Sequence, residues 1–260
     1  MSAELPGAGV VITGGAGGIG AALARRFAAE GARVGVADLD ADACRAVADE
    51  VGGVPLPGDA ATEDGVRALI EAARDALGSI DVFCANAGVA PTGGPEAPED
   101  AWAGAWEVNV MAHVRAARLL LPDWLARGRG HFLAVVSAAG LLTSLGSAPY
   151  SVSKHGALAF AEWLAATYRH RGITVQAVCP QGVRTRMLAD TGPAGRLIMG
   201  ESAIAPEQVA DSVLAAWPEG RFLVLPHPEV ADYYAARATQ NERWLGGMNK
   251  LQRKVEDALG

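Results

Sequence analysis

Short apolar runs alternate with amphipathic segments along the whole chain. The first run, GVVIT at 9–13, ends in a cluster of glycines, and six more follow at 33–38, 54–59, 81–86, 131–138, 173–180 and 221–226. Apolar runs of this length, bounded by turn residues, are typical of buried strands. The pattern therefore predicts seven strands.

Segments with helical spacing separate most of these strands. We expect helices at 19–30, 41–51, 66–77, 101–127 and from Tyr150 to about residue 170. Strands that alternate with helices form βαβ units, which build a parallel sheet covered by helices on both faces. We predict one doubly wound α/β domain over 1–260, with a substrate loop at about 183–205 and a C-terminal helical extension at about 228–260.

The composition excludes several classes of partner. The 260 residues carry a net charge of -7, which argues against nucleic acid or an anionic membrane as a main partner. The N-terminus lacks the basic start and apolar run of a signal peptide, and the three cysteines are scattered. The five histidines form no metal-binding motif. We therefore expect a cytoplasmic protein without a metal site.

The first strand leads directly into TGGAGGIG at 13–20. This stretch fits G-x-G-x-x-G through Gly15, Gly17 and Gly20, and T-G-x-x-x-G-x-G through Thr13 and Gly14 onwards. Such glycines let the backbone turn tightly and bring its N–H groups against a pyrophosphate. Because a strand precedes the cluster and a helix follows it, the cluster predicts a dinucleotide site.

An acidic residue ends the second strand. Asp38 lies eighteen residues after Gly20, where a carboxylate can accept hydrogen bonds from both ribose hydroxyls and would repel a 2′-phosphate. No basic residue stands in the glycine loop or just after Asp38 to offset that repulsion. NAD is therefore favoured over NADP. The alternative is a solvent-facing aspartate that caps the next helix.

Tyr150 and Lys154 stand four residues apart in PYSVSKHG, on one face of a predicted helix. A free tyrosine is a poor base at neutral pH, and a nearby ammonium group favours its ionised form. A surface Tyr–Lys pair with no chemical role is the alternative. Ser137 ends the preceding strand, so its hydroxyl should lie at the carboxyl edge of the sheet beside the same helix.

The chain resembles the short-chain dehydrogenase/reductase family, in its single-domain form, over nearly its whole length. The resemblance implies a Rossmann fold with a seven-stranded parallel sheet flanked by helices on both faces. The motifs that carry it occur in the expected order: TGGAGGIG, Asp38, Asp59 in GDAAT, NAG at 86–88, Asn109, Ser137, Tyr150-x-x-x-Lys154 and CPQGVRT at 179–185.

The resemblance also implies a role for each matched position. Tyr150 is the general acid/base, Ser137 orients the substrate oxygen, Lys154 binds the nicotinamide ribose and lowers the Tyr150 pKa, and Asn109 holds a water in a proton relay. The cofactor contacts are Gly14, Gly18, Ile19, Gly20, Asp38, Leu39, Asp59, Ala60, Asn86, Ala87, Gly88, Tyr150, Lys154, Pro180, Val183 and Thr185. The substrate contacts are Ser137, Ala139, Tyr150, Gln181 and Met187.

One position departs from the family pattern. The family usually has glycine directly after the proline of its P-G-x-V-x-T loop, where this chain has Gln181. Gln181 is either a pocket residue or a tolerated variation of the loop. The other expected pocket walls are mostly apolar, which favours a hydrophobic or neutral secondary alcohol or ketone, although Arg184, Arg186 and Arg196 leave a carboxylate-bearing substrate open.

These observations predict an NAD-dependent enzyme that interconverts a secondary alcohol and a ketone. The alternatives are an NADPH-type carbonyl reductase of the same fold and a non-catalytic NAD-binding sensor or structural protein. The helices that carry Asn109 and Tyr150 hold more apolar residues than one buried stripe needs. We therefore expect a homo-oligomer, a tetramer or a dimer.

Overall fold

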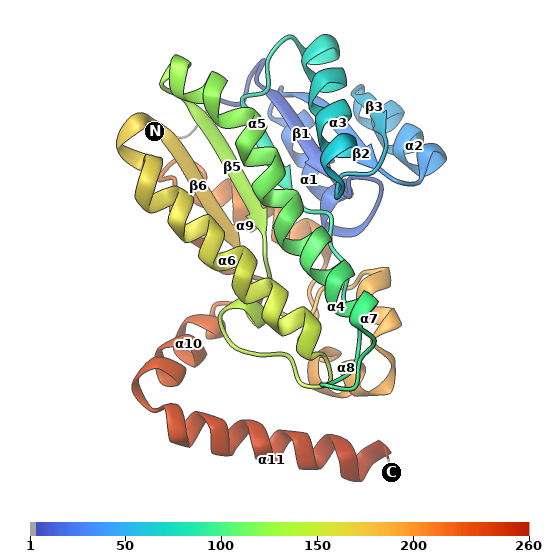
Figure 1. The fold of residues 1–260 in the computed structure, drawn as a ribbon, viewed down its shortest axis with the longest axis vertical. Coiled ribbons are helices and arrows are strands. Elements are labelled where there is room, and N and C mark those ends of the chain that lie inside the picture. Colours follow the sequence, from blue (N-terminus) through green and yellow to red (C-terminus); the bar gives the residue numbers. More distant parts are fainter. Residues whose placement is uncertain (1–3, 260) are drawn as a thin grey trace.

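The structure is a computed structural model that describes residues 4–259, so Gly260, the last residue of the predicted extension, lies outside the described residues. It contains one seven-stranded sheet (Figure 1) in the order β3-β2-β1-β4-β5-β6-β7, with every neighbouring pair parallel. The strands are β1 (Gly9–Thr13), β2 (Arg33–Asp38), β3 (Val54–Pro57), β4 (Val82–Ala85), β5 (Gly130–Val135), β6 (Ile173–Val178) and β7 (Leu223–Val224). The seven predicted strands and the parallel sheet are confirmed.

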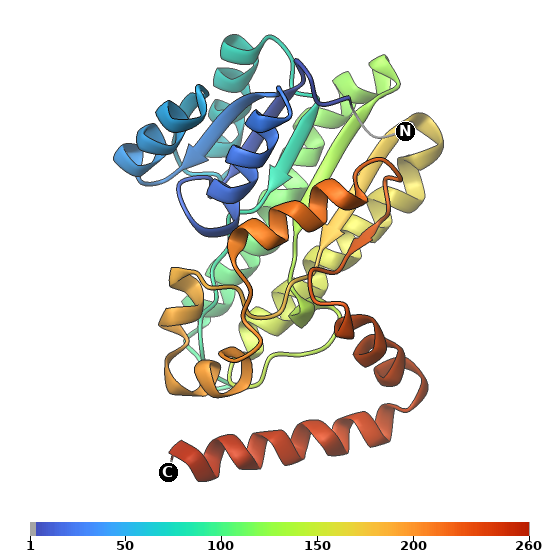
Figure 2. The same ribbon diagram turned by 180° about the vertical axis from the view of Figure 1, so that it is seen from behind.

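Helices cover both faces of the sheet (Figures 1 and 2) and create two separate cores. One face packs on α3 (Glu63–Leu77), α5 (Ala112–Arg127) and α6 (Ala148–Tyr168), and the other on α1 (Gly18–Ala29), α2 (Ala41–Val51) and α9 (Pro206–Ala216). Successive side chains of a strand point to opposite faces, so a strand buried on both faces is apolar throughout. All six residues of β5 are buried, including one histidine.

The expected long helix at 101–127 is interrupted. It consists of α4 (Glu99–Trp106), a π-turn (Glu107–Met111) and α5, and the Ala112 N–H bonds to the Glu107 carbonyl five residues back. One residue is thus added to a turn, which shifts the face that later residues present. Asn109 lies in the middle of this turn.

The helix α9 was not predicted, although its start carries recognisable signals. Pro206 occupies the first turn, and the Ala205 N–H donates to the Gln208 side chain at 2.9 Å. Val209 and Val213 are buried one turn apart. The expected substrate loop also contains two short helices, α7 (Arg186–Asp190) and α8 (Gly192–Met199).

The C-terminal region forms two helices, α10 (Glu229–Thr239) and α11 (Asn241–Leu259). Figures 1 and 2 show α11 lying apart from the sheet, across the end of the molecule, where it contacts α8. Arg237 of α10 donates to the Leu141 carbonyl and to His155 Nε2, and its guanidinium lies over the Trp244 ring. None of the helices in the described part of the chain has the length and apolar composition that a membrane span needs.

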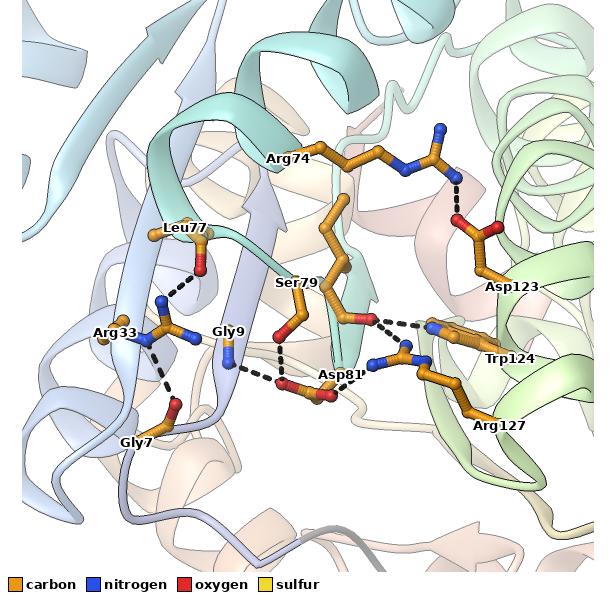
Figure 3. A network of polar contacts seen from close by, with 11 residues as sticks. Gly7, Gly9, Arg33, Arg74, Leu77, Ser79, Asp81, Asp123, Trp124 and Arg127 are labelled. Carbon is orange, nitrogen blue, oxygen red and sulfur yellow. Dashed lines mark hydrogen bonds and ion pairs between the residues drawn. The ribbon is translucent and has the colours of Figure 1, made fainter.

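A polar network joins the amino ends of the central strands (Figure 3). Asp81 accepts from the Gly9 N–H and the Ser79 hydroxyl, both at 3.0 Å, and pairs with Arg127 at 2.8 Å. Burial alone raises the pKa of Asp81, but these hydrogen bonds and the Arg127 charge outweigh it and leave the pKa below its ordinary value. The network fixes β1 against β4 at the edge opposite the loops described below.

Two histidines are buried in the cores. His131 bonds Gln176 at 2.9 Å and stacks on Trp217, whereas neither ring nitrogen of His113 has a partner among the described residues. Burial lowers the pKa of each to about 3, and the Lys154 charge adds a smaller effect at His113. Both imidazoles are therefore neutral in the folded protein near neutral pH.

Replacing His113 by leucine should reduce the acid sensitivity of the fold. Between about pH 6.5 and about pH 3 the unfolded chain holds a proton on this residue that the folded chain lacks, so stability falls as the pH falls. Each such histidine contributes a slope of about 1.4 kcal/mol per pH unit. Urea unfolding from pH 7 to pH 5 should show a shallower slope for His113→Leu. The control is the same substitution at the exposed His170. If His113→Leu kept the wild-type slope, the prediction would be wrong.

Candidate functional site

The loops after β1, β2, β4, β5 and β6 gather at one edge of the sheet, because parallel strands all end on the same side. They carry the glycine cluster, Asp38, the NAG segment, Ser137 and the segment that begins at Pro180. The strand order reverses between β1 and β4, which is where a doubly wound sheet binds its ligand.

Close approach of the backbone explains most of the glycines in the loop after β1. Gly14 and Gly18 have φ of +60° and +50°, values that other residues rarely adopt. A Cβ at Gly20 would lie 2.0 Å from the Gly14 carbonyl oxygen. A Cβ at Gly17, by contrast, would have no atom within 4 Å. The loop is thus tightly packed against other protein atoms at Gly20, whereas the space next to Gly17 holds no protein atom.

The helix that follows this loop begins without a side-chain cap. Gly17 is the N-cap of α1, and no side chain bonds to its first turn. Uncapped N–H groups and the helix dipole favour an anion such as a pyrophosphate. The uncapped start and the open space at Gly17 therefore fit the phosphates of a dinucleotide.

Asn86 and Thr13 fix the shape of the loop from below. The Asn86 amide donates to the carbonyls of Thr13 (2.9 Å) and Gly14 (3.0 Å), while the Thr13 hydroxyl accepts from the N–H groups of Asn86 and Ala87. The side chain of Asn86 is thus used to hold the loop, and its backbone is left for contact with a ligand.

Asp38 is half-buried and faces the glycine loop. Its Oδ2 accepts from the Ala16 N–H at 3.0 Å and its Oδ1 from the Asp40 N–H at 3.3 Å. Asp40, not Asp38, caps α2, because its side chain accepts from the N–H groups of the first turn. The helix-capping alternative for Asp38 is therefore wrong. Leu39 next to it is 75% exposed.

The remaining expected cofactor contacts lie around this loop. Asp59 uses Oδ1 to accept from the Ala61 N–H at 2.8 Å, and Ala60 is half-buried beside it. Thr185 reaches the loop from the other side, since a Cβ at Gly18 would lie 2.9 Å from its methyl group. Val183 is buried in a bridge to Ile204.

Ser137 and Tyr150 meet beyond the end of β5. Ser137 Oγ accepts from the Ala139 N–H at 3.1 Å and lies 3.5 Å from the Pro180 carbonyl. Burial raises the pKa of Tyr150, and a hydrogen bond from Ser137 opposes this by lowering it. Burial has the larger effect, so the protein without a ligand does not hold Tyr150 as a phenolate. The expected lowering of its pKa is not found in this state.

Lys154 is buried beside Tyr150. It is 3% exposed, its Nζ donates to the Val135 carbonyl at 3.0 Å, and the same atom lies 5.6 Å from the centre of the Tyr150 ring. Burial lowers the pKa of Lys154 to about 8. The two residues therefore share one face of α6, as their spacing predicts.

Three hydrogen bonds hold the side chain of Asn109 in place. Its amide donates to the Val89 carbonyl and the Ser153 hydroxyl, both at 2.9 Å, and its Oδ1 accepts from the Val89 N–H at 3.0 Å. A Cβ at Gly88 would lie 3.1 Å from Asn109 Oδ1 and 3.5 Å from Lys154 Nζ. A side chain at position 88 would therefore crowd Asn109 Oδ1.

The expected substrate contacts differ in how exposed they are. Ala139 is 7% exposed, Gln181 is half-buried and Met187 is 39% exposed on α7. Sequence reasoning missed Val89 and Ser153, which hold Asn109, and His227, whose Nδ1 accepts from the Gln181 N–H at 3.1 Å. No local motif signals these three residues. Within the part of the chain that the structure covers, no cluster of three His, Cys, Asp or Glu side chains could hold a metal.

Known proteins match both the sequence and the fold. The family model described as short chain dehydrogenase matches residues 8–195. The 1-deoxy-11-beta-hydroxypentalenate dehydrogenase of Streptomyces exfoliatus is 38% identical over 229 residues, which cover 84% of this chain and 82% of that protein. The 2-(S)-hydroxypropyl-CoM dehydrogenase 3 of Xanthobacter autotrophicus is 34% identical, over 85% and 86% of the two chains.

A solved structure matches almost the whole chain. The short chain dehydrogenase/reductase from Burkholderia phymatum, crystallised in complex with NAD, superposes with a TM-score of 0.82 at 27% sequence identity. The match covers 92% of this chain and 96% of that one.

Gly20→Ala and Gly17→Ala should separate the packing of the glycine loop from its ligand-binding role. The new methyl group at position 20 would overlap a backbone carbonyl, so we expect a loss of several kcal/mol in the free energy of unfolding. At position 17 it would meet no protein atom, so stability should change by less than about 1 kcal/mol while NAD binding weakens. Urea unfolding and titration with NAD test both. Equal stability of the two variants would contradict this account of the loop.

Proposed function

This chain belongs to the short-chain dehydrogenase/reductase family, and from that premise we propose that it is an NAD-dependent oxidoreductase that interconverts a secondary alcohol and the matching ketone. One observation carries the proposal: Ser137, Tyr150 and the buried Lys154 lie together at the end of β5, with Ser137 close enough to lower the Tyr150 pKa and Lys154 Nζ 5.6 Å from the centre of the Tyr150 ring.

Tyr150 would move the hydroxyl proton. In the reduction of a ketone it gives its proton to the oxygen, and in the oxidation of an alcohol it receives one. Ser137 is anchored by the Ala139 N–H, so its hydroxyl can hold the substrate oxygen against Tyr150. A bound nicotinamide would supply the hydride acceptor or donor for the carbon.

Lys154 would favour the ionised form of Tyr150 and bind a ribose hydroxyl. An ammonium group has three donors, and Val135 takes one, which leaves two for other partners. With its pKa near 8, Lys154 is still mostly protonated at neutral pH. Its charge stands close enough to the Tyr150 ring to favour a phenolate as the proton leaves.

Asn109 would complete a proton relay through a water above Gly88. Both amide hydrogens of Asn109 are engaged, so it can bind a water only through its acceptor Oδ1. This oxygen and Lys154 Nζ both lie close to Gly88, 3.1 and 3.5 Å from where a Cβ of that residue would stand, so a single water could bridge the two atoms beside the glycine. A water there would connect the lysine with Asn109.

NAD is the cofactor that the residues around Asp38 favour. A carboxylate has about four acceptor positions, so Asp38 can bond two backbone N–H groups and still accept from ribose hydroxyls. A 2′-phosphate would face its charge, with Ala16, Gly17 and Leu39 as uncharged neighbours. The NAD complex of the structural relative agrees with this choice.

The substrate would be neutral and largely apolar, bound by Ala139, Gln181, Met187 and the substrate loop at 183–205. Two arginines of this loop already have partners, since Arg184 donates to the Ala203 carbonyl and Arg186 pairs with Asp190 at 3.7 Å. The names of the two relatives above state a hydroxyl-bearing compound in each case.

Assays of secondary alcohols with NAD should detect the activity, and Tyr150→Phe should abolish it. Loss of a general acid/base typically lowers kcat by about 10² to 10⁴-fold. The measurement is NADH absorbance over a panel of secondary alcohols, and over ketones with NADH. Tyr168→Phe is the matched control, because it makes the same change near the far end of α6.

The same assay separates the alternatives. Better turnover with NADP would contradict the role given to Asp38 and favour a carbonyl reductase of the NADPH type. Tight NAD binding without turnover of any alcohol or ketone would favour a sensor or structural protein.

The proposed enzyme would act as a homo-oligomer, a tetramer or a dimer. Three large apolar residues are exposed on α4 and α6: Trp106 (43%), Val152 (51%) and Trp163 (54%). Such helix faces are commonly covered across a two-fold axis. Sedimentation equilibrium should give a mass of two or four chains. Trp163→Glu should shift the protein toward the monomer, and a monomeric wild type would refute the proposal.

A further inference from the structure

His227 links two segments at the substrate end of the site. It lies between β7 and α10 and is 3% exposed. The Gln181 N–H donates to its Nδ1 at 3.1 Å, and its Nε2 lies 3.2 Å from the Ser202 carbonyl. Gln181 begins the segment after Pro180, and Ser202 lies near the far end of the substrate loop.

These two partners fix the chemical form of the imidazole. A backbone N–H can only donate and a carbonyl can only accept. Nδ1 must therefore carry a lone pair, and Nε2 must carry the hydrogen. His227 is therefore the neutral Nε2–H tautomer. Its Nδ1 is bonded to Gln181, just before the substrate loop, and its Nε2 to Ser202, near the far end of that loop.

The two ends of the substrate loop are already joined at their base. Val183 and Ile204 form a bridge, with the Arg184 N–H donating to the Ile204 carbonyl (2.9 Å) and the Ile204 N–H to the Gly182 carbonyl (3.1 Å). A Cβ at Gly182 would lie 2.8 Å from the Met199 carbonyl oxygen. His227 adds a further connection next to this bridge. Unlike the bridge, this connection includes the backbone of Gln181.

Gln181 has a fixed backbone and a free side chain. The Pro180 carbonyl before it accepts from the Ala138 N–H at 2.8 Å, next to Ser137. The Gln181 side chain is half-buried, and its amide makes no hydrogen bond to any residue between 4 and 259. A half-buried amide without a partner can both donate to and accept from a ligand.

We propose that His227 is a positioning residue that holds Gln181 so that its side-chain amide binds a second oxygen of the substrate, on a carbon close to the carbinol. The inference rests on the proposed function. It narrows the substrate class to alcohols and ketones that carry a further hydroxyl or carbonyl group near the reacting carbon.

The chain offers a graded set of variants at this position. The Asn side-chain oxygen can replace Nδ1 as the acceptor for the Gln181 N–H, and the Gln side-chain nitrogen can replace Nε2 as the donor to Ser202. His227→Leu removes both contacts. Gln181→Ala removes the proposed substrate contact and leaves the backbone link.

The test compares two substrates that differ by one hydroxyl group. The best alcohol of the panel is assayed with and without a hydroxyl on the carbon next to the carbinol. Wild type should prefer the form with two oxygens, and Gln181→Ala and His227→Leu should each reduce that preference about tenfold, chiefly through KM. His227→Asn should keep most of the preference, because it keeps the acceptor for the Gln181 N–H. His227→Gln should lose the preference, because it keeps only the contact with Ser202. The double variant, Gln181→Ala with His227→Leu, should lose no more of this preference than Gln181→Ala alone. The KM for NAD should be unchanged in all these variants.

Hydrogen exchange gives a readout that does not depend on turnover. The Gln181 amide should exchange faster in His227→Leu than in wild type and stay protected in His227→Asn. Equal exchange in wild type and His227→Leu, or a preference that survives His227→Leu, would overturn the role of His227. Absence of any turnover by wild type would overturn the proposed function itself, and the assigned role would fall with it.

Discussion

The parallel alignment of the seven strands is the constraint on which the site depends. Each strand ends at the same edge, so residues from 13 to 181 reach one region of space although they are far apart in the chain. The reversal of order between β1 and β4 opens that edge. Thr13 holds this point together, because its hydroxyl bonds the backbone of Asn86 and Ala87 across the reversal. Together with the Asn86 amide, which bonds the Thr13 and Gly14 carbonyls, this contact fixes the base of the glycine loop.

The sequence predicts those parts of the fold that depend on local pattern. The strands can be predicted because both their faces are buried, which makes them continuous apolar runs. The shared face of Tyr150 and Lys154 can be predicted because residues four apart lie on one side of a helix. The π-turn at Asn109 is not readable, since a bond from Ala112 to Glu107 depends on how α4 and α5 pack. The same holds for the partners that shape the site. Ser153, Val135 and His227 are separated from Asn109, Lys154 and Gln181 by 44, 19 and 46 residues, and no periodicity relates residues so far apart.

Burial determines the electrostatics of the site more than any single charge. An ammonium group in the core is costly unless it is bonded, and among the described residues Lys154 donates a hydrogen bond to the Val135 carbonyl alone. The same burial raises the pKa of Tyr150 and lowers that of Lys154, so both effects oppose a charged pair. The protein alone thus keeps the tyrosine protonated, and a ligand that bonds Lys154 would alter the balance. The stable cores on both faces of the sheet make this arrangement tolerable.

The loop after β6 divides the site into two parts with different physical requirements. Pro180 faces the Ser137 turn, where proton transfer needs atoms held to a fraction of an ångström. After Gln181 the chain enters a segment with two short helices, which under the proposed function would admit and release the substrate. A neutral imidazole suits the boundary, because it joins the backbones of Gln181 and Ser202 without adding a charge to the site. Changes at Gln181 and in the substrate loop can therefore alter which substrate binds while leaving Ser137, Tyr150 and Lys154 in place.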